Sequence, residues 1–171
     1  MVSVLGGGVS LFNALPIVTR NIWHTYVTGL HIEHAYPGIQ GMGFSLLFQP
    51  TEKDEHLQRI RDEGFPQYTV WPEGDRPLYT SIIYLEPFGG RNLRAFGYDM
   101  FSEPIRRAAM ERARDTGDTA ISEKVTLVQE THQGVQAGFL MYVPVYKKGM
   151  ELHTAEQRQQ ALFGYATARF V

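Results

Sequence analysis

The segment formed by residues 84–146 restricts the fold of this chain more than any other part of the sequence. An alternating apolar stretch ends in an acid, Asp99, and an amphipathic stretch follows at residues 102–116. Two strand-like runs come next, at residues 125–129 and 138–146. Alternation with a period of two predicts strands, whereas apolar residues three and four apart predict a helix. The order strand, acid, helix, strand, strand favours a pocket that holds a molecule over one that transforms it.

The helix predicted at residues 102–116 has signals at both ends. Ser102 is a typical cap, Pro104 lies in the first turn, and Gly117 follows the last turn. Its apolar stripe is narrow and made mostly of small residues: Ile105, Ala108, Ala109 and Ala113. Small side chains allow a helix to lie close to a sheet.

Residues 11–35 are predicted to form one long helix, a stalk that precedes the other elements. Its apolar side chains recur three and four residues apart and share one face: Leu11, Leu15, Val18, Ile22, Tyr26 and Leu30. Pro16 marks a kink or the true start of this helix. Arg20 and Glu33 are the two charged side chains of residues 1–50. A stripe of this length exceeds what one small sheet can cover, so we predict a homodimer through the N-terminal helix.

The other predicted elements complete an α+β chain. Strands are expected at residues 39–48, 67–71, 79–86 and 93–99, and a polar helix at residues 51–63. A long N-terminal helix followed by strands with short helices between them indicates an α+β fold. Such a fold has a mostly antiparallel sheet with flanking helices.

Composition excludes several classes of function. The 171 residues contain no cysteine, which rules out thiol catalysis, thiolate metal sites and disulfide bonds. The net charge of −2 gives no indication of a nucleic-acid partner. No nucleophile, zinc-protease or phosphate-loop motif is present, so we expect no catalysis and no cofactor. His24, His31 and His34 could share a helical face, but such histidines are usually solvated, and we expect no metal site.

No apolar run in the sequence is long enough to cross a bilayer. The nearest candidate, residues 2–18, is interrupted by three glycines, an asparagine and a proline. Because the chain begins and ends inside apolar patterns, we expect it to be a soluble piece of a larger protein.

Several motifs resemble the CHASE domain, the extracytoplasmic sensory module of membrane histidine kinases and nucleotide cyclases. They are YLEP at residues 84–87, GYDMFSEPIRRAAMERARDTG at 97–117, ISEKVTLVQE at 121–130 and GFLMYVPVY at 138–146, with weaker matches in PGIQGMGF at 37–44 and GYATARF at 164–170. The resemblance implies a stalk helix at residues 1–38 and a PAS-like ligand-binding unit at residues 39–150. Residues 151–171 would then begin a truncated, membrane-proximal unit.

The resemblance also implies where the protein is and which residues contact a ligand. Family members are flanked by membrane-spanning helices, so the full-length protein is expected to be membrane-anchored, with this domain in the periplasm or outside the cell. Asp99 stands at the family's acid position, where a carboxylate can accept a hydrogen bond from a ligand N–H. It could equally bond the backbone near Ser102. Ile121 and Thr131 stand where the family has backbone and hydroxyl contacts to ligand.

Further side chains could form the walls of a pocket, although core packing is the ordinary role of such residues: Phe96, Tyr98, Phe139, Met141 and Tyr142. Alternation places Phe96 and Tyr98 on one face of their strand. It places Phe139 and Met141 on one face of theirs, and Tyr142 on the other. We predict one closed cavity between the sheet and the helix at residues 102–116, with Asp99 at its rim.

These observations predict a small-molecule sensor domain of a bacterial transmembrane receptor, of the histidine kinase or diguanylate cyclase type. Binding of a small organic ligand would change the packing of the stalk helices. The alternative is a protein–protein interaction module without a small-molecule ligand, which a filled core and an exposed apolar sheet face would favour. The identity of the ligand and the type of output domain stay open.

Overall fold

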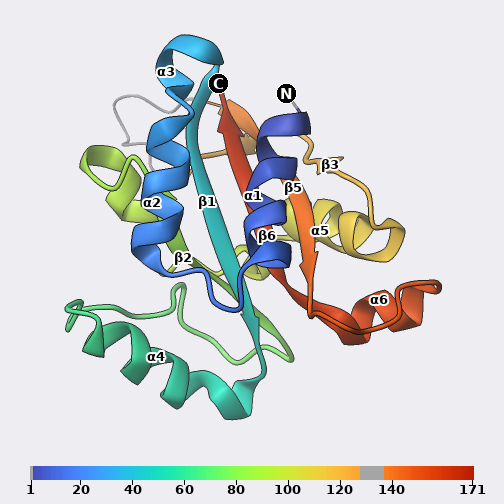
Figure 1. The fold of residues 1–171 in the computed structure, drawn as a ribbon. Coiled ribbons are helices and arrows are strands. Elements are labelled where there is room, and N and C mark those ends of the chain that lie inside the picture. Colours follow the sequence, from blue (N-terminus) through green and yellow to red (C-terminus); the bar gives the residue numbers. More distant parts are fainter. Residues whose placement is uncertain (1, 128–136) are drawn as a thin grey trace.

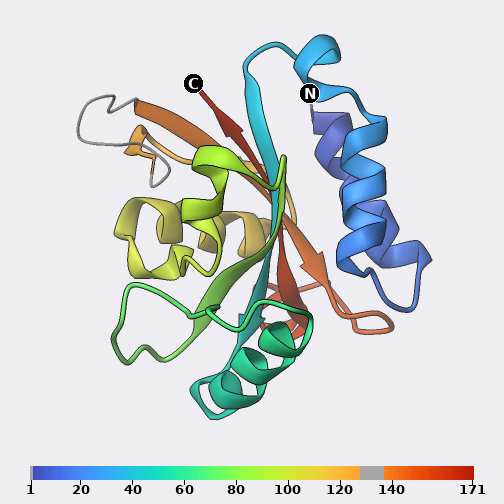
Figure 2. The same cartoon turned by 90° about the vertical axis from the view of Figure 1, so that its left-hand side faces the viewer.

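The domain is built on one antiparallel sheet with helices on both of its faces (Figures 1 and 2). The computed structural model describes residues 2–127 and 137–171. The strands are β1 (Ile39–Phe48), β2 (Tyr79–Glu86), β3 (Ala120–Ile121), β4 (Val125–Thr126), β5 (Ala137–Tyr146) and β6 (Leu162–Phe170). The helices are α1 (Val2–Ala14), α2 (Arg20–Gly29), α3 (Ile32–Ala35), α4 (Lys53–Asp62), α5 (Pro104–Thr116) and α6 (Ala155–Ala161), with the 3-10 helices η1 (Pro50–Glu52), η2 (Gly90–Ala95) and η3 (Met100–Ser102). All pairings between these strands are antiparallel, which confirms the predicted fold class.

β6 lies at the centre of the sheet, and this corrects the prediction that residues 151–171 begin a separate unit. The strand order is β2-β1-β6-β5-β3, with β4 also paired to β5. Phe44 of β1 pairs with Ala166, and Met141 of β5 pairs with Ala168. β6 is buried on both faces, so its sequence lacks the alternation that identifies a half-exposed strand. The PAS-like unit therefore includes the C-terminal strand.

Each face of the sheet has its own apolar core, because neighbouring side chains of a strand point to opposite faces. On β5, Met141 and Val145 face the N-terminal helices, whereas Leu140 and Tyr142 face α5. Both cores contain several aromatic side chains. Figure 2 shows the N-terminal helices on one side of the sheet and α5 on the other.

The predicted single stalk helix is wrong: its residues form a helical hairpin. α1 ends at Ala14, Pro16 lies in the connection, and Thr19 starts α2 by accepting a hydrogen bond from the Ile22 amide (3.2 Å). Proline cannot continue the backbone hydrogen bonding of a helix, which accounts for the break. α1 and α2 run in opposite directions across the same face of the sheet (Figure 1).

The apolar stripe that predicted a dimer packs against the domain's own core. Val18 is buried, and the other five members are partly buried against the apolar cluster that contains Met141 and Val145. We call this the hairpin-side cluster, and the cluster on the other face the α5-side cluster. The stripe is therefore not a continuous uncovered helix face, because the chain reverses within it. The homodimer stays a prediction that this geometry no longer favours.

α5 confirms the helix predicted from residues 102–116, with a different residue as its cap. The Glu103 side chain accepts hydrogen bonds from the amides of Ile105 and Arg106, at 3.0 and 2.8 Å. Ser102 instead donates to the carbonyl of Asp99 (2.6 Å). A carboxylate at this position also interacts favourably with the helix dipole.

Residues 93–99 do not form the predicted strand. η2 covers the first part, and single bridges join Tyr98 to Trp71 and Asp99 to Ser81. Without regular alternation, Phe96 and Tyr98 do not share a face: Phe96 packs with the hairpin-side cluster and Tyr98 with the α5-side cluster. The predicted strand at residues 67–71 is likewise reduced to the bridge at Trp71.

A buried chain of polar groups joins α4 to β2 and predicts a pH dependence of stability. His56 Nε2 lies 2.7 Å from the Tyr68 hydroxyl, which is hydrogen-bonded to Ser81. Burial, with a smaller effect from the Arg59 charge, lowers the pKa of His56 to about 4. The unfolded chain then binds a proton below about pH 6.5 that the folded chain does not bind until about pH 4.

We therefore expect the free energy of unfolding to fall by roughly 2 kcal/mol between pH 7.5 and pH 5, beyond what other groups contribute. Urea unfolding of the wild type and of His56→Gln at both pH values measures this difference. The variant keeps a hydrogen-bonding side chain for Tyr68 but cannot titrate. Equal losses of stability in the two proteins would show that His56 is not responsible.

Candidate functional site

Asp99 is fully buried, and its carboxylate contacts other groups of the protein. Oδ1 accepts hydrogen bonds from the amides of Thr80 (2.9 Å) and Phe101 (3.0 Å). Arg76 Nη1 lies 3.2 Å from Oδ2, close enough for an ion pair although not aligned as a directional hydrogen bond. These contacts make Asp99 the cap of η3 and the counter-ion of Arg76. Contact between Asp99 and a ligand stays a prediction.

A small, partly open pocket of about 30 Å³ lies on the α5 side of the sheet, where we predicted a closed cavity. Its lining comes from both sides of the sheet–helix interface: Gly41, Gly43, Ile82, Leu85, Asn92, Tyr98, Met100, Arg106, Leu127, Leu140, Thr167 and Arg169. A space of this size holds a water molecule or two, not an organic ligand. The residues on both sides of Asp99 line the cavity, but Asp99 itself does not.

Buried polar side chains converge on this cavity, and Arg106 is the most enclosed cation among them. Its Nη2 donates to the carbonyl of Thr126 (2.8 Å), and its Nη1 lies 3.4 Å from the Tyr98 hydroxyl. Glu103 Oε2 is 3.5 Å from the same Nη1 and partly balances the charge. The guanidinium also lies 5.3 Å from the centre of the Tyr98 ring. Burial of a cation is costly unless it is paired, so this arrangement marks a functional candidate.

Arg106 and Arg169 line the cavity but were not predicted as site residues. Arg106 lies three and seven residues before Ala109 and Ala113, on the face of α5 that packs on the sheet. A charged residue on a stripe of small side chains was the available signal. Arg169 and Thr167 lie two residues apart on the buried strand β6, and both line the cavity. Arg169 Nη2 donates to the carbonyl of Gln40 (3.4 Å).

Of the predicted ligand contacts, the structure brings Tyr98 to the cavity and leaves most others elsewhere. Ile121 is 47% exposed on β3, and its carbonyl accepts a hydrogen bond from Arg112 Nη2 (2.8 Å). Phe139, 41% exposed, stacks on Phe170 on the opposite face of the sheet.

Two more predicted contacts lie on the hairpin side, and one lies outside the described residues. Met141 is buried in the hairpin-side core, and Phe96 packs at its edge. Thr131 falls within residues 128–136, which the structure does not describe. The roles of these residues in ligand binding stay predictions.

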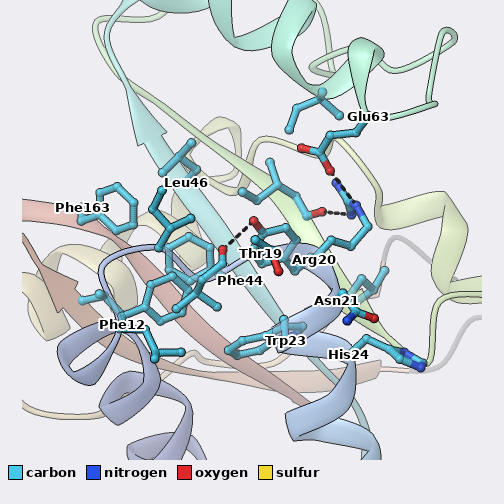
Figure 3. Close-up of a pocket in the computed structure, with 18 of the residues that line it drawn as sticks. Phe12, Thr19, Arg20, Asn21, Trp23, His24, Phe44, Leu46, Glu63 and Phe163 are labelled. Atoms are coloured by element: carbon cyan, nitrogen blue, oxygen red, sulfur yellow. Dashed lines mark hydrogen bonds and ion pairs between the residues drawn. The ribbon is translucent and has the colours of Figure 1, made fainter.

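A second and much larger hollow lies on the hairpin face of the sheet. This hairpin cleft has a volume of about 1260 Å³ and is bounded by the α1–α2 connection, α4, the sheet and the turn after β5. Figure 3 shows its aromatic floor, with Phe12, Trp23, Phe44 and Phe163 gathered together. Arg20 donates through Nε to Glu63 (3.0 Å) across the cleft wall. The same guanidinium lies 4.6 Å from the centre of the Phe65 ring.

Within residues 2–127 and 137–171, no group of three histidine or acidic side chains is placed to hold a metal ion. Over the same residues, no helix is long and apolar enough to span a membrane.

An antiparallel sheet in the order β2-β1-β6-β5-β3, with helices on both faces, is a PAS-like α+β architecture. The CHASE domain profile matches residues 16–171, which is most of the sequence, and the chain belongs to the CHASE domain family. CHASE domains are extracellular sensor domains of signalling receptors. The match begins in the α1–α2 connection and extends through β6.

The chain is also similar to a eukaryotic signalling protein. It is 29% identical over 96 residues to the Hybrid signal transduction histidine kinase A of Dictyostelium discoideum. The aligned part is 54% of this chain, and it spans only 4% of that relative's length.

Proposed function

We propose that this domain is the extracytoplasmic part of a transmembrane signalling receptor of bacterial type, and that it binds a small organic molecule in the α5-side cavity. The family supports the sensory role. The observation that carries the ligand site is the convergence of buried Arg106, Tyr98 and Thr167 on a small pocket with mostly apolar walls. A few placed polar groups within apolar walls are typical of small-molecule sites.

A ligand larger than water requires this small cavity to expand. α5 and η2 contribute Arg106 and Asn92 to the lining, and both elements lie outside the sheet. A ligand that binds the expanded form shifts the population of the domain toward it. Such a shift would alter the packing of the sheet and, on its other face, of the α1–α2 hairpin. The hairpin would carry the signal toward the membrane.

The output of the receptor would reside in other domains. The similarity to a hybrid histidine kinase favours a kinase output for this chain, and a diguanylate cyclase is the other type expected from the family. The domain itself would be non-catalytic, since CHASE is a sensor family.

A screen of small organic metabolites by thermal unfolding tests the proposal. We expect at least one compound to raise the midpoint temperature in a saturable manner, because binding to the folded state alone stabilises it. Arg106→Met should weaken binding of that compound by about tenfold or more, the usual effect of removing a charged hydrogen-bonding group. Arg94→Met is the matched control, because Arg94 is exposed and does not line the cavity.

Two results would contradict the proposed site. One is a compound that binds both variants as tightly as the wild type. The other is the absence of any saturable binder, which would favour the alternative of a protein–protein interaction module.

A further inference from the structure

The hairpin cleft has a rigid apolar floor made from distant parts of the chain. Phe12 of α1 stacks on Phe44 of β1 with ring centres 4.2 Å apart, and Phe163 of β6 lies 5.8 Å from Phe44. Trp23 of α2 is fully buried and lies 6.4 Å from the same ring. Four elements therefore fix the floor. Above these mostly buried rings, Ile17 (73% exposed) and Phe88 (36% exposed) belong to the same lining and offer apolar surface to an apolar molecule.

The carboxylates that line the cleft are already paired. Glu63 accepts a hydrogen bond from Arg20, and Glu86 Oε1 lies 2.9 Å from His24 Nδ1. Figure 3 shows Arg20 directed at Glu63 along the wall. Neither acid is left to receive a cationic ligand.

The remaining charged side chains of the lining are cations. Lys147 and Lys148 belong to the turn after β5, and Arg59 belongs to α4. Among the described residues, none of the three has a carboxylate within ion-pair distance, and Lys148 Nζ donates to the carbonyl of Leu15. The cleft is thus apolar inside, with uncompensated positive charge at its boundary.

We propose that the hairpin cleft is a second ligand site and that its occupant is an amphipathic anion, with one carboxylate and an extended apolar body. The body lies over the aromatic floor, where burial of apolar surface supplies the binding energy. The carboxylate lies near Lys147, Lys148 and Arg59, which select its charge. The occupant holds the α1–α2 connection against α4, so this site acts on the hairpin directly.

Trp23 provides a local signal for the test. The sequence has two tryptophans, and the other, Trp71, packs on Tyr98 away from the cleft. In a Trp71→Phe protein, we expect 11-bromoundecanoate to quench Trp23 fluorescence with saturation. Decanoate should compete with it. Decanol should compete about tenfold more weakly, and decyltrimethylammonium should not compete, because the charge is opposite.

Charge variants separate the head group from the apolar body. The triple variant Arg59→Gln, Lys147→Gln, Lys148→Gln should weaken decanoate by about tenfold or more and leave decanol unchanged. Lys124→Gln, at an exposed lysine outside the cleft lining, should change neither. Circular dichroism verifies that each variant is folded.

Several results would overturn the proposal. Equal affinities for decanoate and decanol would remove the role of the cations, as would an unaltered decanoate affinity in the triple variant. Absence of quenching up to the solubility limit would show that the cleft takes no such ligand. Sedimentation showing a dimer that excludes 11-bromoundecanoate would identify a second copy of the chain as the occupant instead.

Discussion

Replacing Asp99 by alanine is expected to lower the free energy of unfolding by about 3–5 kcal/mol, the usual result of removing one partner from a buried ion pair. The carboxylate holds two backbone amides through Oδ1 and balances Arg76 through Oδ2. Its loss leaves two buried amides without their acceptor and leaves Arg76, whose side chain is 17% exposed, without its counter-ion. For a domain of this size, such a change removes a large part of the total stability.

Urea unfolding followed by circular dichroism measures this effect. Asp99→Asn keeps an acceptor oxygen and loses the charge, so it should cost about half as much. Asp75→Ala is the matched control, because Asp75 is exposed and lies next to Arg76 in the sequence. It should change stability by less than about 0.5 kcal/mol. A stable Asp99→Ala protein that binds ligand poorly would instead assign Asp99 to ligand recognition.

The second large effect is expected at Gly97, which positions the two residues that follow it. Its φ of +83° lies in the left-handed region, and an added Cβ would lie 2.0 Å from the carbonyl oxygen of Thr69. The backbone cannot move away easily, because the Gly97 amide donates to Ile82 and the Gly97 carbonyl accepts from Trp71. Gly97→Ala should therefore destabilise the domain by more than about 3 kcal/mol, or prevent folding, through strain and overlap together.

Gly149→Ala separates these two causes. Gly149 has a similar φ of +76°, and nothing lies within 4 Å of its would-be Cβ. That variant should cost about 1 kcal/mol from the backbone conformation alone. Equal losses of stability in Gly97→Ala and Gly149→Ala, measured by urea unfolding, would show that the contact with Thr69 is relieved at little cost.

The α1–α2 hairpin is fastened to the rest of the domain by polar contacts at several points. Arg20 reaches Glu63, His24 reaches Glu86, and the Tyr84 hydroxyl donates to the carbonyl of Val18 (2.9 Å). These contacts join the hairpin to β2 and to the segment after α4. In the proposed sensor, these contacts would couple β2 to the N-terminal helices.

The candidate site was only partly predictable from local patterns. Tyr98 was predicted as an aromatic wall residue, and it does line the cavity. The face of β5 that meets α5 carries Leu140 and Tyr142. The prediction named Tyr142 as a possible wall residue, but it favoured Phe139 and Met141, which lie on the other face. Alternation separates the two faces of a strand correctly, but it does not say which face meets which helix.

Elements whose signals are local were determined by the sequence. The limits of α5 follow from a proline in its first turn and a glycine at its end, and β1 and β2 follow from short apolar runs bounded by turns. The motifs at residues 97–117 and 138–146 also indicated the family, because they occur in the order that the family has. Capping, proline geometry and periodicity act within a few residues, so they are written in the sequence itself.

Tertiary contacts settled the rest. β6 is the central strand because it pairs with β1 and β5 along almost its whole length, and a strand buried on both faces has no alternation to identify it. The N-terminal helices fold back because Phe12 of α1 and Trp23 of α2 both pack against Phe44 of the sheet. Asp99 faces Arg76 and the amides of Thr80 and Phe101 rather than a cavity. Each of these outcomes depends on pairing between residues far apart in the chain, which no short window of sequence contains.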